Sequence, residues 1–178
     1  FNDKITRVTC EEAGAWCVDE PLSSIGRPPT TYVNVDKAKV RGIEASVDIP
    51  LTRALKLNAT GTLTDSEQLT GANAGAALND TPKRQASASL NWKPDARLSA
   101  YVRAVYRGEE AVTEAQISGE STVAPDYTVV DIGASYKISP AFTFHAGVQN
   151  LLDKRLNYDT AAYMIDPARL WMGVGVRF

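Results

Sequence analysis

Few side chains in this 178-residue sequence could do chemistry, and they do not form a catalytic set. His145 is the only histidine, and general-base catalysis needs several partner groups around such a residue. The sequence has no Gly-rich phosphate loop and no clustered spacing of metal ligands. We therefore expect no catalytic residue, no metal and no cofactor, and we expect His145 to make structural hydrogen bonds.

Two cysteines close a short acidic segment, Cys10-Glu-Glu-Ala-Gly-Ala-Trp-Cys17, and a Pro- and Gly-containing stretch follows them. A zinc site needs about four ligands, which this segment does not offer. Oxidising compartments retain disulfides in exposed loops. We expect a disulfide between Cys10 and Cys17, with two free thiols as the alternative.

Tyr101, Arg103 and Arg107 stand at odd positions of one extended run, so they share a face if that run is a strand. A guanidinium offers fork-like donors to anions and stacks on aromatic rings, which suits an anionic aromatic ligand. The alternative, which we favour, is that Arg103 and Arg107 pair with carboxylates such as Glu44 and Asp131. Two tyrosines of a later connection are further candidates for ligand contact: Tyr158 and Tyr163.

The elements that position these residues are predicted by an alternation of period two, with almost no helical periodicity. In the clearest run, Ile43, Ala45 and Val47 alternate with Glu44 and Ser46. Similar runs of about 9–11 residues, the length of a tilted membrane strand, cover residues 55–64, 85–92, 98–107, 130–138, 142–149 and 170–178. With residues 1–8 as the tail of a first strand, about eight strands are expected.

The composition is that of an ordinary soluble domain, with net charge -2, 44% hydrophobic residues and a mean hydropathy of -0.21. No apolar run approaches the roughly 20 residues of a spanning helix. A membrane β-barrel is still compatible with this composition. Its lipid-facing and inward-facing residues alternate, so their hydropathy averages to a mildly hydrophilic value. The near-neutral charge gives no reason to expect nucleic acid as a partner.

Connection lengths alternate as well, which separates a barrel from a sandwich. Short turns are expected at Thr52, Pro94 and Pro140. Long connections are expected at Thr9–Thr31, Gln68–Pro82, Glu109–Asp126 and Asn157–Ala168. Trp92, Tyr136 and Phe142 stand near the short turns, where an interfacial aromatic girdle falls. A soluble β-sandwich has strands of about 5–6 residues and no such segregation. We therefore expect an antiparallel transmembrane β-barrel with extracellular long loops.

Four segments resemble the TonB-dependent outer-membrane receptors, and ferric siderophore receptors in particular. They are Val33–Glu44 (with Gly42-Ile-Glu44), Tyr127–Asp131, Gly147–Arg155 (with Asn150-Leu-Leu-Asp153) and Asp166–Phe178, with Ala168 where Gly is usual. Their order and spacing agree from Asn34 to Phe178. The last strand, ending on Phe178, is similar to the signal by which such proteins are recognised for barrel assembly.

The resemblance implies a plugged barrel of about 22 strands in the outer membrane of a Gram-negative cell. Residues 1–178 would be its C-terminal part, with the plug domain outside this chain. The implied function is transport of a ferric siderophore or similar iron chelate, with TonB as a partner through the plug. One alternative is a complete small barrel of eight strands with a structural or adhesion role. Another is an outer-membrane hydrolase.

Lys37, Lys39 and Arg41 share a face with Ile43 and Val47, so they should point outward just above the apolar band. Cations at that height are favourable beside lipid phosphates. We expect them to meet lipopolysaccharide headgroups, and a solvated strand above the membrane is the alternative.

Overall fold

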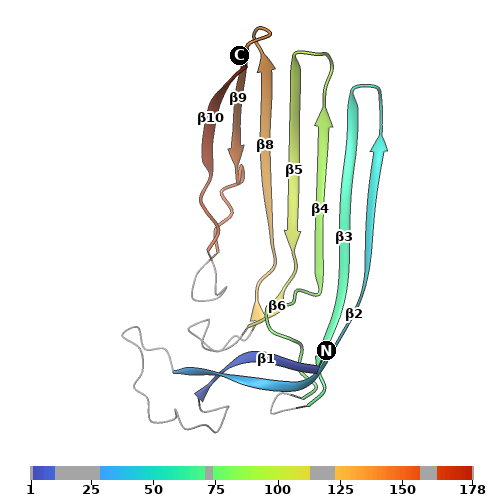
Figure 1. Cartoon of the computed structure of the whole chain (residues 1–178), viewed down its shortest axis with the longest axis vertical. Helices are drawn as coiled ribbons and strands as arrows, with labels where there is room; N and C mark the ends of the chain where they lie inside the picture. Colours follow the sequence, from blue (N-terminus) through green and yellow to red (C-terminus); the bar gives the residue numbers. More distant parts are fainter. Residues whose placement is uncertain (1, 11–28, 71–73, 113–122, 157–163, 178) are drawn as a thin grey trace.

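A computed structural model describes residues 2–10, 29–70, 74–112, 123–156 and 164–177 of the chain. Eight strands form one antiparallel sheet in the order β1-β2-β3-β4-β5-β8-β9-β10, so each strand lies beside its neighbour in sequence (Figure 1). The bounds are β1 Asn2–Thr9, β2 Thr30–Pro50, β3 Leu55–Gln68, β4 Arg84–Trp92, β5 Leu98–Arg107, β8 Tyr127–Lys137, β9 Phe142–Gln149 and β10 Arg169–Val176. The expected strands are confirmed. The expected connection at Glu109–Asp126 also holds a two-stranded sheet, β6 Glu110–Ala111 with β7 Val123–Ala124.

The strand register gathers the apolar residues on one face of the sheet. Ile43 pairs with Leu63, and Leu90 pairs with Val102, which in turn pairs with Ile132. This apolar face is uncovered: Ile43 is 72% exposed and Met172 is 68% exposed. The described part of the chain forms a single layer here, so the β-sandwich alternative is wrong. An uncovered apolar face of this size marks a surface that contacts either a membrane or another protein surface, and the first agrees with the expected barrel.

The short turns lie together at one end of the sheet, where the last described residues also lie (Figure 1). Asp95 shapes the β4–β5 turn, because its Oδ1 accepts hydrogen bonds from the backbone N–H groups of Leu98 (2.8 Å) and Arg97 (2.7 Å). These bonds stabilise the carboxylate and hold the pKa of Asp95 below its usual value. Trp92, Tyr136 and Phe142 are between 45% and 47% exposed, in agreement with an aromatic girdle at this end.

The β1–β2 hairpin lies across the long-loop end of the other strands (Figure 1). The two segments predicted around residues 34–44 and 43–51 form one strand of 21 residues, β2. Its change of direction is held near Lys37, whose backbone N–H donates to Thr70 Oγ1 (3.0 Å) and whose carbonyl accepts from Leu69 N–H (2.9 Å). Beside this point, Ala38 packs against Leu78 in a small buried cluster.

The eight-stranded sheet is open, because β1 and β10 stand at its two ends and do not pair. The alternative of a complete small barrel is therefore wrong, since its first and last strands would have to meet. Among the described residues, no helix combines the length and apolar character needed to cross a membrane.

Candidate functional site

The face opposite the apolar one, which we call the polar face, carries a network of hydroxyl and amide hydrogen bonds between neighbouring strands. Thr60 and Ser87 hydroxyls are 2.8 Å apart, and Asn91 Nδ2 donates to Asn58 Oδ1 at 2.9 Å. Ser135 Oγ lies 2.8 Å from His145 Nδ1, so the only histidine takes part in this network as expected. Exposed hydrogen bonds of this kind suit a wall that faces water.

Arg103 lies at the edge of a pocket of about 360 Å³ that is lined mainly by small polar and apolar residues of β2, β3 and β4. Asp48, Asn58 and Ser89 supply further polar groups to it. Arg103 stands opposite Asp131 in the β5–β8 register. No ion pair joins the two in the described part of the chain, and Asp131 Oδ1 accepts a hydrogen bond from Asn150 N–H (2.8 Å). Asp131 therefore does not neutralise the Arg103 guanidinium, which can interact with an anion in this pocket.

Arg107 is engaged by a carboxylate of the neighbouring loop. Its Nε and Nη2 donate to the two oxygens of Glu110 at 2.9 and 2.7 Å, a bidentate pair. The Glu110 side chain is only 1% exposed. The carboxylate that pairs with Arg107 is thus that of Glu110, whereas the sequence had suggested Glu44. Tyr101 lies nearer the short turns than either arginine, early in β5, and its ring packs over Gly133.

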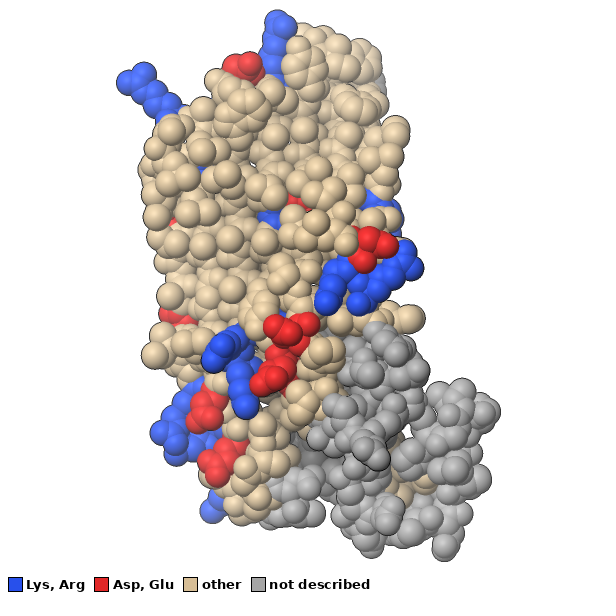
Figure 2. Space-filling view, turned by 180° about the vertical axis from the view of Figure 1, so that it is seen from behind, with Lys and Arg blue, Asp and Glu red and all other residues tan. Residues whose placement is uncertain are grey.

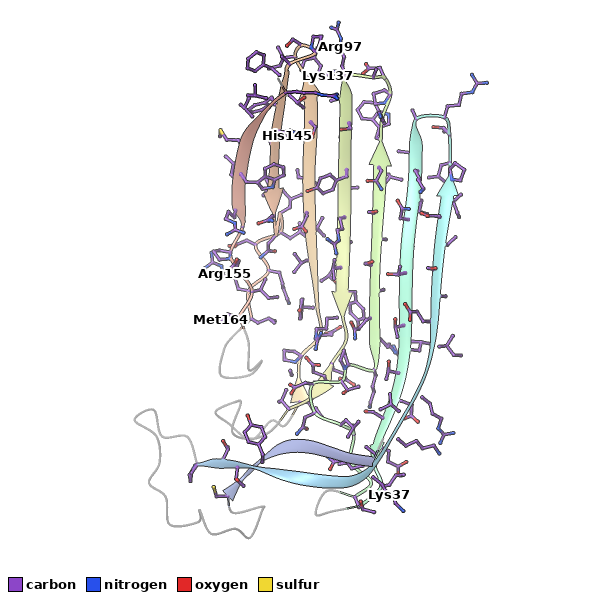
Figure 3. The ribbon with its side chains drawn as sticks, viewed as in Figure 1. Lys37, Arg97, Lys137, His145, Arg155 and Met164 are labelled. Atoms are coloured by element: carbon purple, nitrogen blue, oxygen red, sulfur yellow. The ribbon has the colours of Figure 1, made fainter. Side chains whose placement is uncertain are left out.

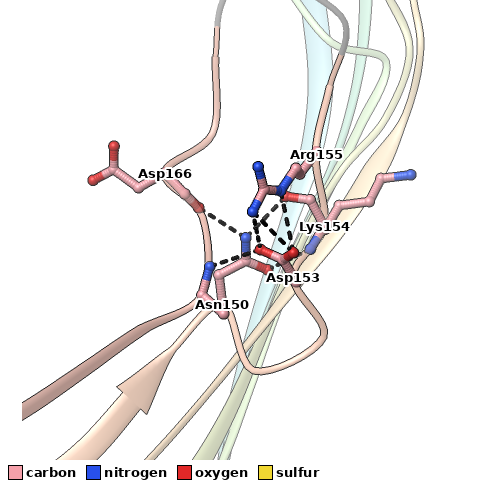
Figure 4. A network of polar contacts seen from close by, with 6 residues as sticks. Asn150, Asp153, Lys154, Arg155 and Asp166 are labelled. Atoms are coloured by element: carbon pink, nitrogen blue, oxygen red, sulfur yellow. Dashed lines mark hydrogen bonds and ion pairs between the residues drawn. The ribbon is translucent and has the colours of Figure 1, made fainter.

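A buried asparagine organises the start of the β9–β10 connection (Figure 4). Asn150 is 3% exposed, and its Nδ2 donates to the carbonyls of Lys154 and Asp166, both at 2.8 Å. Its Oδ1 accepts from Lys154 N–H at 2.9 Å. Asn150 has a φ of 48°, a left-handed conformation that asparagine tolerates better than most residues. The side chain thus ties together both ends of the connection.

Asp153 adds a second tie in the same place (Figure 4). Its Oδ1 accepts from Ala168 N–H (2.8 Å), and Arg155 forms an ion pair with the Asp153 carboxylate at 3.1 Å. The backbone hydrogen bond from Ala168, and then the Arg155 contact, hold the pKa of Asp153 below its usual value. Asn150 and Asp153 were not predicted as site residues, although the Gly147–Arg155 segment that carries the resemblance contains both.

A second pocket, of about 470 Å³, lies on the apolar side of the sheet towards the long loops. Its lining combines Ile43 and Leu63 with the cations Arg41, Lys83 and Arg84. Figure 2 shows this side as a broad uncharged surface whose lower end carries basic and acidic side chains together. Lys37, Lys39 and Arg41 are all exposed, and Lys37 lies where the hairpin turns across the sheet (Figure 3). In the β2–β3 register, Asp65 stands opposite Arg41.

Several predicted site residues lie outside the described residues: Cys17, Tyr158, Tyr163 and Phe178. Cys10 is described and buried, at 1% exposure, and the Cys10–Cys17 disulfide stays a prediction. Within the described ranges, no three His, Cys, Asp or Glu residues come together as a metal site. Lys83 and Arg84 could not be predicted as neighbours of Arg41, because the three residues come together only when β2, β3 and β4 lie side by side.

Comparison with known proteins agrees with this architecture. Over 178 residues, the chain is 37% identical to the iron-regulated outer membrane virulence protein of Vibrio cholerae, covering 100% of this chain and 27% of that protein. It is 26% identical over 153 residues to the ferrienterobactin receptor of Escherichia coli K12, covering 82% of this chain and 20% of that receptor. A solved ferric enterobactin receptor of Pseudomonas aeruginosa superposes with a TM-score of 0.70 at 20% identity, over 99% of this chain and 27% of that one.

The chain therefore spans about a quarter of the length of the relatives it matches (27% of the Vibrio protein). Residues 1–151 match the family model described as TonB dependent receptor-like, beta-barrel. Together with the open sheet and its uncovered apolar face, this match shows that the chain belongs to the TonB-dependent receptor family and forms part of the β-barrel wall in the outer membrane.

Proposed function

We propose that the protein containing this chain imports a ferric siderophore or a similar iron chelate across the outer membrane. The main support is the identity of 37% over the whole chain to an iron-regulated outer membrane protein. The names of other relatives point to ferric enterobactin as their ligand. The substrate of this protein would be of the same chemical class, an anionic iron chelate with aromatic groups.

The part of this chain that would meet the ligand is the polar face of the wall. Arg103 supports this role because it borders a pocket and makes no ion pair within the described part of the chain. Arg107 is partly neutralised by Glu110, so it would contribute less charge. Tyr101 would contribute little directly, because its ring lies against the wall. Tyr158 and Tyr163 remain proposed contacts on the last long connection.

Energy for import would come from TonB, acting through a plug domain carried by a part of the protein outside this chain. In this proposal the chain has no enzymatic role, and an outer-membrane hydrolase would be the competing function. Replacing His145 with Ala separates the two, because the wall of a transporter tolerates the loss of one hydrogen bond to Ser135. Transport with His145→Ala close to the wild-type rate supports the proposal. A hydrolytic activity of the purified protein that this change abolishes would contradict it.

Lipopolysaccharide is the second proposed partner, and the pocket on the apolar side favours it. The pocket places three cations beside exposed Ile43 and Leu63, on the long-loop side of these residues: Arg41, Lys83 and Arg84. The cations could bind the phosphates of one lipid while its acyl chains contact the apolar residues. We expect Arg41→Gln with Lys83→Gln and Arg84→Gln to lower the lipopolysaccharide that co-purifies with the receptor. The matched control is Arg53→Gln with Lys93→Gln and Arg97→Gln, which removes the same number of charges at the opposite end. Unchanged lipopolysaccharide in the first variant would reject this contact.

A further inference from the structure

Two aromatic rings cover neighbouring glycines on the polar face of the wall. The Tyr101 ring lies over Gly133, with its nearest atom 2.6 Å from the Cβ position of that glycine. The Trp171 ring lies over Gly147 in the same way, at 2.8 Å. Gly133 pairs directly with Gly147 in the β8–β9 register, and Cβ positions of such pairs are about 4.5–5.5 Å apart. The two rings are therefore neighbours, and we call the surface that they form the aromatic platform.

The outer faces of these rings are open to the water-facing side. Gly133 and Gly147 are buried beneath the rings, whereas Tyr101 and Trp171 stay partly exposed. The described part of the chain is a single layer here, so it provides no second layer over the platform. A ring that lies against the wall adds little to capture of a ligand at the long loops. Its outer face can nevertheless stack with another aromatic ring.

A guanidinium group stands beside each ring on its long-loop side. Arg103 is two residues from Tyr101 on β5, and Arg169 is two residues from Trp171 on β10. Residues at this spacing in a strand share a face. In both strands the arginine is the member of the pair nearer the long loops, so a ligand that moves from the loops towards the short turns meets the charge first and the ring next.

These two arginines keep donors for an anionic group. Arg103 forms no ion pair in the described part of the chain, because Asp131 opposite it accepts from Asn150 N–H. Arg169 donates to Gln149 Oε1 at 2.6 and 3.1 Å, and it lies 3.8 Å from Asp166. Both side chains of the Arg169–Asp166 pair are well exposed, so the pair neutralises little of the charge.

Open space follows the platform on its short-turn side. Gly173 comes two residues after Trp171 on the same face and pairs with His145 of β9. No atom of the described residues lies within 4 Å of the Cβ position of Gly173. The next residue of β10 on this face is again a glycine, Gly175. The wall is thus recessed beside Trp171, and a ring stacked on the indole has room there.

We propose that the aromatic platform, with Arg103 and Arg169, is an intermediate binding position for one anionic aromatic group of the iron chelate during its passage through the barrel. This inference rests on the proposed function and adds the place on the wall where the chelate rests after capture. The competing occupant is an apolar side chain of the plug domain, which would require neither an aromatic partner nor the two guanidinium groups.

The test measures ferric enterobactin, the ligand in the names of several relatives, on cells whose only receptor for it is the full-length protein. Equilibrium binding gives the affinity and the number of folded receptors, and uptake is expressed per bound receptor. Gly173→Leu fills the recess, and we expect unchanged binding with uptake about two- to tenfold slower, the range of one aromatic stacking contact. Gly61→Leu is the control, because it adds the same side chain on the apolar face, where the nearest atom is 3.9 Å from the Cβ position. It should leave binding and uptake unchanged.

Two substitutions of Trp171 separate a stacked ligand from the plug. Trp171→Tyr keeps an aromatic face and should keep most of the uptake, whereas Trp171→Leu should lose it by the same two- to tenfold factor. An apolar side chain of the plug would pack against Leu as well as against Tyr, and Gly173→Leu would then collide with it and lower the unfolding temperature of the receptor.

Equal uptake with Trp171→Tyr and Trp171→Leu would overturn the proposal, and so would a lowered unfolding temperature of Gly173→Leu. Wild-type uptake that Gly173→Leu preserves would reject the platform alone. A wild type that neither binds nor imports ferric enterobactin would reject the platform together with this ligand class for the proposed function.

Discussion

The ring of Tyr101 on β5 occupies the space that a side chain on Gly133 of β8 would need. A Cβ atom built on Gly133 would lie 2.6 Å from Cε1 of that ring, and the two residues are directly paired in the register. The same arrangement recurs between Trp171 and Gly147, where the corresponding distance to the indole ring is 2.8 Å. Aromatic rings thus lie flat along the polar face over glycines, which covers exposed backbone and keeps the rings close to the wall.

Replacing Gly133 with Ala should displace the Tyr101 ring from the wall. The added methyl group requires the ring to rotate away, and we expect a loss of about 1–3 kcal/mol in stability, in the range of overpacked sites. Thermal unfolding of the purified receptor measures the effect. Gly173→Ala is the control, because no atom lies within 4 Å of the Cβ position there. Equal unfolding temperatures for the two variants would show that the ring does not depend on Gly133.

The β9–β10 connection should depend strongly on the side-chain amide of Asn150, although Asn150 lies in a loop. Asn150→Asp removes the two donors to Lys154 and Asp166 and buries a charge, so we expect the β9–β10 connection to open. Asn150→Gly preserves the left-handed backbone and removes only the side-chain bonds. Hydrogen exchange of Lys154 N–H and limited proteolysis report the opening. Protection as in the wild type in both variants would contradict the role assigned to this side chain.

The Asp153 contacts predict a local response to acid. Because the pKa of Asp153 is lower in the folded protein than its unfolded value of about 4, the carboxylate stabilises the loop above that pH. This contribution is lost as the pH falls through the folded-state pKa. Proteolysis of the connection should therefore accelerate in the wild type when the pH falls from 6 towards about 3. Asp153→Asn should be cleaved faster at pH 6 and respond less to acid, and an equal acid response in both proteins would reject the assignment.

The two lumen arginines should differ in their effect on ligand affinity. Arg103→Gln removes a charge that no carboxylate neutralises in the described part of the chain, so we expect binding of an anionic iron chelate to weaken about tenfold. Arg107→Gln should weaken binding less, because Glu110 already balances Arg107. Equilibrium binding to whole cells measures both. A larger effect at Arg107 than at Arg103 would contradict this ranking.

The strands could be predicted from sequence because the two faces of each strand meet different surroundings. Residues such as Val102 and Arg103 alternate strictly, and this pattern is local and has a period of two. The register follows from it, since a shift by one residue would place Arg103 on the membrane side. Connection lengths and aromatic placement added the membrane context that composition does not reveal, and the resemblance of Asn150–Asp153 narrowed it to a known family.

Other contacts could not be predicted, because they depend on which distant strands and loops become neighbours. Lys83 and Arg84 meet Arg41 only after β3 has been placed between β2 and β4. Glu110 reaches Arg107 only because the chain turns sharply after β5 and pairs β6 with β7. The lateral order of strands was predictable, but the conformation of the long connections was not, because it is set by single hydrogen bonds such as those of Asn150.

Uptake of radiolabelled iron would show directly whether this receptor imports ferric siderophores. Cells that lack the encoding gene would be compared with complemented cells, in strains with and without TonB, over a panel of ferric siderophores that includes enterobactin. We expect uptake of at least one chelate to require both the gene and TonB. Uptake of every chelate at the same rate with and without the gene would contradict it.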